Sequence, residues 1–186
     1  MENLLKLAGA LGDNALTAPL PPVEKWNPEH CGAMDLVIRR DGLWVHEKTP
    51  IGRPQLVQLF ARILRRDGDD YFLVTPVEKI GITVEDVPFI ITLLEAEGEG
   101  VDQNILVQTN LGERFTIGPD HPLAFRDYRP EGSSKPTPAP YVTVRRNLQA
   151  RFSRNAWYDL AALAKSDRQK GTIGVWSEGV FYPLPV

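Results

Sequence analysis

The sequence predicts an α+β protein with a duplicated core, in which two similar domains each pack one helix on a mostly antiparallel sheet. The first observation is a stretch from Thr49 to Leu64 whose apolar residues recur at helical spacing, which lets a helix bury one face; they are Leu56, Leu59, Phe60, Ile63 and Leu64. The second is that this pattern returns near the C-terminus. The third is that the segments around both helices are rich in β-forming residues and turn signals.

The repeat is recognised by a constant spacing between the two halves of the chain. Arg154 stands 101 positions after Arg53, and each of these arginines opens a predicted helix. The strand after each helix keeps the same spacing, since residues 72–74 correspond to residues 173–175. We therefore expect an N-terminal arm over residues 1–20, a first α+β domain over 21–87 and a second over 88–186.

Composition agrees with a folded protein and limits its partners. The 186 residues include 42% hydrophobic and 24% charged residues, which is ordinary for a globular protein. A single cysteine, Cys31, excludes an internal disulfide and suits a reducing compartment, so we expect a cytoplasmic protein. The net charge of −3 argues against long nucleic acids but allows one positive pocket for a small anion. No apolar run is long enough to cross a membrane.

In the first half, residues 2–11 predict a short amphipathic helix, and the proline-rich residues 18–28 predict an extended tether. Residues 34–40 predict a strand, and Asp41-Gly42 predicts a hairpin turn into the next strand. The first helix begins around Arg53, with Pro54 at its first position, and ends by Asp67-Gly68.

The second half begins with three β-rich runs that predict an antiparallel meander. Residues 119–140 hold six of the 16 prolines and are predicted to form a surface loop. Two strands, the second helix and a closing hairpin about Glu178-Gly179 follow.

Several segments together resemble a bacterial family known as domain of unknown function 1285. They are CGAMDLVIRRDGLWVHEKTPIGR, LVQLFARIL, YFLVTPVEK, VEDVPF and PYVTVRRNLQARFSR, in that order. The resemblance covers about residues 20 to 165 and implies two related α+β domains, the second loosely like a pleckstrin-homology fold. It also implies a nucleotide-like ligand at the domain interface and a signalling role, with no activity established. Lys48 and Asn147 stand where the family usually has glycine. Asn147 suits a positive φ, whereas Lys48 is expected to alter a turn beside the candidate site.

No motif for catalysis, a metal or a cofactor stands out. The three histidines lack metal-ligand spacing, no nucleophile motif is present, and no phosphate-binding glycine loop occurs, so we expect neither metal nor cofactor. Carboxylates in the predicted connection between the domains are candidates for general acid and base, or for ordinary ion pairs; they are Glu78, Glu85 and Asp86. Trp44 is a candidate for stacking on a ligand, or a core residue.

Arg53 and Arg154 carry the sharpest prediction. A cation at a helix N-terminus is unfavourable, so we expect an anion near each of these arginines. One hypothesis is an internal carboxylate such as Asp35, Glu78 or Asp86. The other is an anion pocket between the domains that both arginines share, with an outer shell of three further basic residues; these are Lys79, Arg145 and Arg151.

We therefore expect a binding or signal-transduction module, not an enzyme, for a phosphorylated or nucleotide-like small molecule. An enzyme acting on a phosphorylated small molecule and a protein-interaction adaptor are the alternatives. The sequence does not decide the oligomeric state.

Overall fold

The computed structural model describes residues 9, 16, 18–167 and 171–185. The chain divides into two compact units, Met1–Pro88 and Phe89–Val186, and each is described by itself. The predicted helix over residues 2–11 falls almost entirely outside the described ranges. Within those ranges, no helix is both long and apolar enough to span a bilayer.

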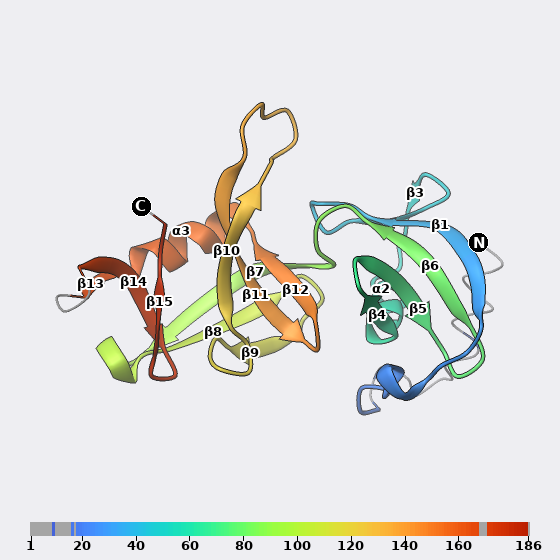
Figure 1. Ribbon diagram of the computed structural model, residues 1–186, viewed down its shortest axis with the longest axis horizontal. Coiled ribbons are helices and arrows are strands. Elements are labelled where there is room, and N and C mark those ends of the chain that lie inside the picture. The colour runs from blue at the N-terminus through green and yellow to red at the C-terminus, as the bar shows by residue number, and fades with distance from the viewer. Residues whose placement is uncertain (1–8, 10–15, 17, 168–170, 186) are drawn as a thin grey trace. The chain divides into compact units, whose positions relative to one another are not determined.

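In the described residues from 18 onward, the N-terminal unit is a six-stranded sheet with the helix α2 (Figure 1). The sheet order is β3-β2-β1-β6-β5-β4, so two three-stranded meanders meet at the parallel pair of β1 and β6. Its elements are η1 (Val23–Lys25), β1 (His30–Ile38), β2 (Trp44–His46), β3 (Thr49–Pro50), α2 (Pro54–Arg62), β4 (Leu64–Asp67), β5 (Asp70–Val74) and β6 (Lys79–Val84).

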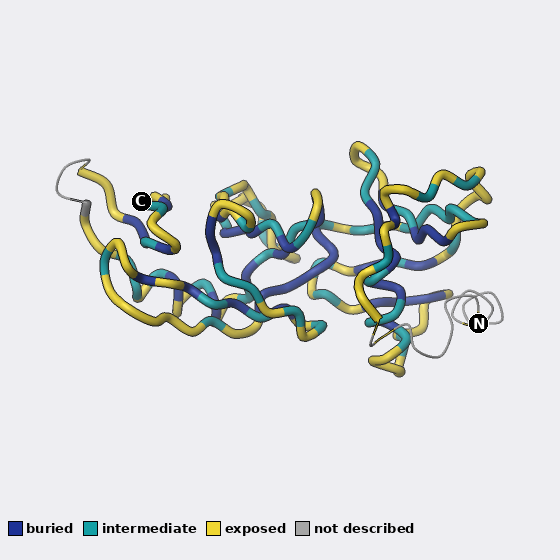
Figure 2. Tube along the Cα trace, turned by 90° about the horizontal axis from the view of Figure 1, so that it is seen from below, coloured by how far each residue is buried: buried dark blue, intermediate teal, exposed yellow. Residues whose placement is uncertain are grey.

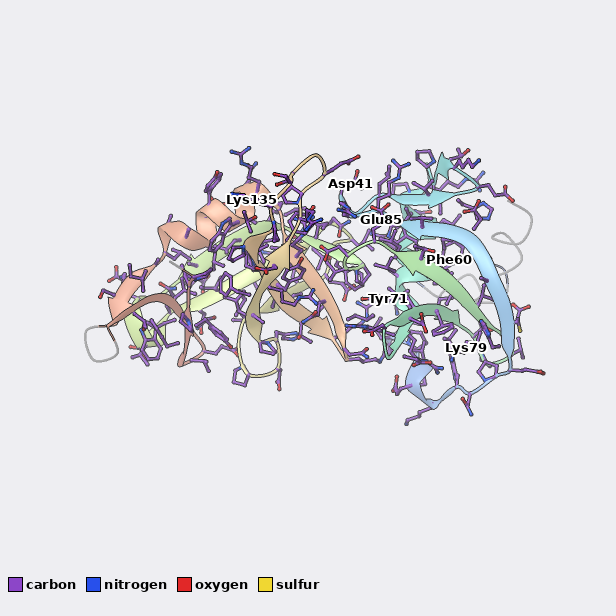
Figure 3. All side chains as sticks on the ribbon, turned by 45° about the horizontal axis from the view of Figure 1, so that its top comes forward. Asp41, Phe60, Tyr71, Lys79, Glu85 and Lys135 are labelled. Carbon is purple, nitrogen blue, oxygen red and sulfur yellow. The ribbon has the colours of Figure 1, made fainter. Side chains whose placement is uncertain are left out.

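Local sequence explains the first hairpin and the start of the helix. The Asp41 carboxylate accepts the backbone N–H of Leu43 at 3.0 Å, and Gly42 has a φ of 86°, so this pair makes the predicted turn between β1 and β2. Pro54 is at the first position of α2, also as predicted. Phe60 on α2 is fully buried in the core of this unit (Figure 3).

The predicted end of the first helix was wrong. The helix ends at Arg62, while Ile63 is its C-cap and Leu64 begins β4. Leu64 pairs with Leu73 on β5, and both side chains are completely buried. A short apolar run fits a buried strand as well as a helix, and here pairing with β5 decided the outcome. Asp67-Gly68 instead lies at the turn between β4 and β5.

The C-terminal unit contains a second six-stranded sheet, a helix and a three-stranded sheet. The larger sheet has the order β10-β11-β12-β7-β8-β9, again two meanders joined by a parallel pair, here β12 and β7. Its elements are β7 (Phe89–Glu97), η2 (Gly100–Asp102), β8 (Asn104–Thr109), β9 (Arg114–Thr116), β10 (Leu123–Tyr128), β11 (Thr137–Arg145), β12 (Leu148–Phe152), α3 (Arg154–Ala162), β13 (Lys165–Asp167), β14 (Thr172–Ser177) and β15 (Val180–Pro183).

The predicted fold class is confirmed, since the chain consists of two similar sheet-rich domains that each carry a helix. Both large sheets join the first strand of one meander to the last strand of the other in parallel. The sequence did not predict these parallel pairs. Buried residues lie along the strands of each unit (Figure 2). The likeness of the second domain to a pleckstrin-homology fold stays a prediction.

The helices occupy different places in the two strand orders. In the N-terminal unit α2 connects the two meanders, between β3 and β4. In the C-terminal unit α3 follows the second meander and leads into the small sheet of β13, β14 and β15. The repeat seen in the sequence therefore matches α2-β4-β5-β6 with α3-β13-β14-β15. The two six-stranded sheets correspond differently: β1-β2-β3 matches β7-β8-β9, and β4-β5-β6 matches β10-β11-β12.

The predicted surface loop over residues 119–140 was wrong at both ends. Strand β10 and the first residues of β11 lie in this range, and only the turn between them extends from the sheet (Figure 1). Pro138 and Pro140 pair with Asp127 and Phe125 on β10, whereas pairing with β12 begins only at Tyr141. One side of this segment thus needs no ladder hydrogen bonds, which allows proline in a strand.

The two departures from the family's glycine pattern have different outcomes. Lys48 has a φ of 64° in the turn between β2 and β3, the conformation that glycine would adopt most easily. In the turn between β11 and β12 the residue with positive φ is Arg146, at 52°, and not Asn147. The argument that asparagine relieves a positive φ at position 147 was therefore wrong.

Candidate functional site

The predicted site residues belong to two groups, one in each unit. Trp44, Arg53, Glu78, Lys79 and Asp86 lie in the N-terminal unit. Arg145, Arg151 and Arg154 lie in the C-terminal unit, and the structure assigns these residues several different roles.

Arg53 and Arg154 flank the starts of their helices as predicted, but among the described residues no carboxylate pairs with either. Arg53 is the exposed N-cap of α2 and makes no side-chain cap. The Arg154 guanidinium lies beside the Tyr158 hydroxyl one turn along α3, with Nε and Nη2 each 3.3 Å from it. Ser153 caps α3 by accepting the Ala156 N–H at 3.2 Å. The role of these two arginines toward a ligand stays a prediction.

Trp44 is a core residue of the N-terminal unit. It is 2% exposed and pairs with Ile38, which is completely buried. Its indole Nε1 is buried and has no hydrogen-bond partner among the described residues. Of the two roles considered for Trp44, stacking on a ligand or packing in the core, the structure shows the core role.

Lys79 and the carboxylates near it are engaged within the N-terminal unit. Lys79, at the start of β6, pairs with Asp67 at 2.8 Å and lies 4.1 Å from the centre of the Phe72 ring (Figure 3). Asp67 also accepts from Arg65 at 2.8 Å. Partial burial works to raise the Asp67 pKa, but the hydrogen bonds from Lys79 and Arg65 outweigh it and hold the pKa below its usual 3.8.

The three carboxylates of the predicted connection lie in turns. Glu78 closes a turn through its backbone, because its carbonyl accepts the Thr75 N–H at 2.8 Å. Glu85 binds the backbone N–H of Arg40 at 3.0 Å, and Asp86 is half-buried. No group of three or more potential metal ligands occurs among the described residues.

Arg145 forms a buried ion pair. Its side chain is 10% exposed, pairs with the Glu113 carboxylate and lies 4.9 Å from the Phe89 ring centre. A guanidinium that is already paired with a carboxylate and nearly buried is poorly placed to bind a further anion.

Arg151 belongs to a cluster that the sequence did not reveal. Its guanidinium lies 4.0 Å from the centre of the Tyr128 ring, and that of Arg126 lies 3.9 Å from the centre of the Tyr141 ring. We name these four residues the Arg–Tyr face. They come from three adjacent strands, β10, β11 and β12 (Figure 1).

Strand register explains why these four side chains share one face of the sheet. Tyr141 pairs with Ala124 on β10 and with Arg151 on β12, so these three point to the same side. Arg126 and Tyr128 follow Ala124 by two and four residues and point there too. Phe125 points to the opposite side, where it meets Trp157 of α3 at 5.6 Å between ring centres.

The chemistry of the Arg–Tyr face suits an anion with an aromatic part. Stacking on a tyrosine orients a guanidinium and leaves N–H groups at its edge that can bind a phosphate in a bidentate manner. Arg151 also donates from Nη1 to the Phe152 carbonyl at 3.2 Å. The free side of a stacked guanidinium can carry an aromatic ring. Arg126 is exposed, and no carboxylate of the described residues pairs with it. The sequence analysis named Arg151 as a candidate. It placed Arg126 and Tyr128 in a predicted loop, so it did not recognise that these two residues lie on the same face of one strand.

Two family models that together span most of the chain show its family. The N-terminal domain model of the DUF1285 family, a domain of unknown function, matches residues 21–87, and its C-terminal domain model matches residues 88–184. The chain belongs to the DUF1285 family. No curated protein matches it.

Two crystal structures of DUF1285 family proteins are similar to this chain. The one from Silicibacter pomeroyi DSS-3 is 39% identical, with a TM-score of 0.86 over 97% of this chain and 93% of that chain. The one from Shewanella baltica OS155 is 24% identical, with a TM-score of 0.52 over 70% of this chain and 92% of that chain, and it supports the fold alone.

Proposed function

We propose that this DUF1285 protein is a non-enzymatic binding module that senses a small phosphorylated, nucleotide-like molecule, and that the Arg–Tyr face holds this ligand. The observation that carries the proposal is the stacking of two guanidinium groups on two tyrosines along one face of a sheet. Cys31 is exposed and fits a reducing compartment, so we assign this role to the cytoplasm.

The charge of the protein agrees with a small ligand. A net charge of −3 disfavours long polyanions, yet two neighbouring arginines make a local positive region. Arg126 and Arg151 would bind the phosphate, and a base would stack on the outer side of a guanidinium. Rigid strands hold the donors, which lowers the entropy cost of binding.

A thermal-shift screen of nucleotides, second messengers and organic phosphates tests the proposal. We expect saturable stabilisation by at least one nucleotide, because a ligand that binds only the folded state raises its stability. Arg126→Gln and Arg151→Gln should each weaken the apparent affinity for that nucleotide at least about tenfold, because each removes a charge-assisted contact. Arg114→Gln is the matched control, since Arg114 lies on the same sheet and pairs with Glu95 at the surface.

Other outcomes would contradict parts of the proposal. Turnover of the ligand in the same samples would mean an enzyme acting on a phosphorylated molecule. Absence of any stabilisation would favour a protein-interaction adaptor. A contribution of Arg53 and Arg154 to the same ligand stays a prediction, and Arg53→Gln and Arg154→Gln in the same assay test it.

A further inference from the structure

The outer half of the β10–β11 hairpin carries Arg126 and Tyr128 of the Arg–Tyr face. We name this half, residues 125–128 and 137–140, the hairpin ribbon. Strand β10 is at the end of the strand order, and the pairing of β11 with β12 begins only at Tyr141. The hairpin ribbon is therefore two-stranded where it extends beyond the rest of the sheet (Figure 1). Two strands alone are marginally stable in water, so contacts from outside the hairpin determine how firmly the ribbon is held.

Phe125 provides such a contact, with the helix α3. The centre of its ring lies 5.6 Å from that of Trp157, and the two ring planes meet at 63°, an edge-to-face geometry that aromatic pairs favour. Both residues are half-buried, and Pro140, which pairs with Phe125 across the hairpin, is buried. The contact joins the hairpin ribbon to α3 on the side of the sheet opposite the Arg–Tyr face.

The helix that provides Trp157 is itself anchored to the sheet. Strand β12 ends at Phe152, and Ser153 then caps α3 by accepting the Ala156 N–H at 3.2 Å. Ala156 and Leu160 are completely buried, and α3 packs against β7 and β12. Because Trp157 follows Ala156 directly, its ring is placed by a helix that is fixed on the two central strands of the sheet.

The position of the hairpin ribbon determines both cation–π pairs of the Arg–Tyr face. Phe125 and Arg126 are consecutive on β10 and point to opposite sides of the sheet, so holding Phe125 against α3 limits where Arg126 can lie. Arg126 of the ribbon lies over Tyr141, and Tyr128 of the ribbon lies under Arg151. Each pair thus joins a residue of the ribbon to a residue of the part of the sheet where β11 and β12 are paired.

We infer that Trp157 is a positioning residue for the Arg–Tyr face, and that it acts through Phe125 to hold Arg126 and Tyr128 in the arrangement that binds the ligand. Donors that are held in place before binding lose less entropy when the ligand arrives, which raises affinity. The inference rests on the proposed function, because it concerns the same ligand. It makes an aromatic contact on the opposite side of the sheet a requirement for that binding.

Hydrogen exchange of the full chain tests the positioning without any ligand. We expect Phe125→Leu and Trp157→Leu each to speed the exchange of the amides of residues 126–128 at least about fivefold, because each removes one ring of the pair. Trp157→Phe keeps an aromatic ring and should stay near the wild type. Phe181→Leu is the matched control, since Phe181 forms a similar pair with Trp176, at 5.2 Å between ring centres, on the small sheet of the same unit. It should leave residues 126–128 unchanged.

Calorimetric titration with adenosine triphosphate, at a temperature where every variant is folded, tests the effect on binding. We expect Phe125→Leu and Trp157→Leu to weaken the affinity at least about fivefold and Phe181→Leu to leave it unchanged, because a loss of stability alone does not alter the affinity of the folded protein. Phe125→Leu serves if Trp157→Leu does not fold.

Two results would overturn the inference: unchanged exchange of residues 126–128 in both leucine variants, or affinities equal to that of the wild type. Absence of binding to the wild type would instead count against the proposed function. The exchange experiment would then decide by itself whether Trp157 positions Arg126 and Tyr128.

Discussion

Two sites, one in each unit, use arginine in different ways. In the N-terminal unit, Arg65 is nearly buried and donates hydrogen bonds to two backbone carbonyls and a carboxylate. In the C-terminal unit, the guanidinium groups of Arg126 and Arg151 lie over tyrosine rings, and Arg151 Nη1 also donates to the Phe152 carbonyl at 3.2 Å. Arg65 is therefore part of the fold, whereas the exposed Arg126 is the better placed of the two stacked arginines to bind a ligand. The partner of each arginine, and not its charge, decides which role it has.

This difference arises on sheets of the same strand order. Both sheets join two meanders through one parallel pair. The edge strand β4 is contacted by η1, while the equivalent edge strand β10 carries Arg126 and Tyr128 of the Arg–Tyr face. The shared strand order therefore does not determine which residues lie on the edge strands and exposed faces, and the two units differ at these places.

The largest expected effect contrasts two arginine substitutions. Arg65→Met should lower the free energy of unfolding by about 2 to 4 kcal/mol, because two carbonyls and a carboxylate lose charged donors. Arg126→Met should cost less than about 1 kcal/mol, since an exposed cation–π contact contributes little. Chemical denaturation measures both. Equal losses would break the comparison between the two uses of arginine.

The next effect concerns the small sheet, whose counterpart in the N-terminal unit, β4-β5-β6, is part of the six-stranded sheet. Ser177 is completely buried; its hydroxyl accepts the Ile105 N–H at 2.9 Å and donates to the Ile117 carbonyl. Ser177→Ala should therefore cost about 1 to 3 kcal/mol by leaving these groups unsatisfied. Urea unfolding followed by Trp fluorescence measures this loss. The exposed Ser134→Ala is the control, and a loss no larger than the control's would show that the serine does not join the sheets.

The starts of the two helices offer a smaller effect. Ser153 caps α3, whereas the Arg53 side chain makes no cap on α2. Ser153→Ala should cost about 1 kcal/mol, and Arg53→Ser should stabilise by up to about 1 kcal/mol by supplying a cap and removing an unfavourable cation. Thermal unfolding measures both variants. A lower melting temperature for Arg53→Ser would indicate that Arg53 has a stabilising partner.

The smallest effect is the acid dependence of stability at Asp67. Its pKa is lower in the folded state than its usual 3.8, so its contribution to stability is complete above that pH. The contribution is lost as the pH falls through the folded pKa. The difference in unfolding free energy between wild type and Asp67→Asn should therefore be constant near neutral pH and shrink below about pH 4. A difference that grew on acidification would contradict the ion-pair network.

Local patterns predicted the elements better than their assembly. The turn at Asp41-Gly42 and the start of α2 at Pro54 depend on neighbouring residues, so the sequence predicted them. The end of α2 and the strand character of Pro138 depend on which strand lies beside them, and that is a property of the tertiary fold. Arg126 was missed for the same reason, because its partner Tyr141 lies on the neighbouring strand. Arg151 was found, but its partner Tyr128 was not.

The most direct test of the Arg–Tyr face follows the arginine side chains themselves during ligand titration. Side-chain Nε–H resonances of Arg126, Arg151 and Arg65 are assigned by single substitutions, and a nucleotide found by the thermal-shift screen is added stepwise. We expect the Arg126 and Arg151 resonances to shift along one saturable curve while that of Arg65 stays in place, because its donors are already bonded within the fold. Stationary Arg126 and Arg151 resonances at saturation would contradict a ligand site on this face.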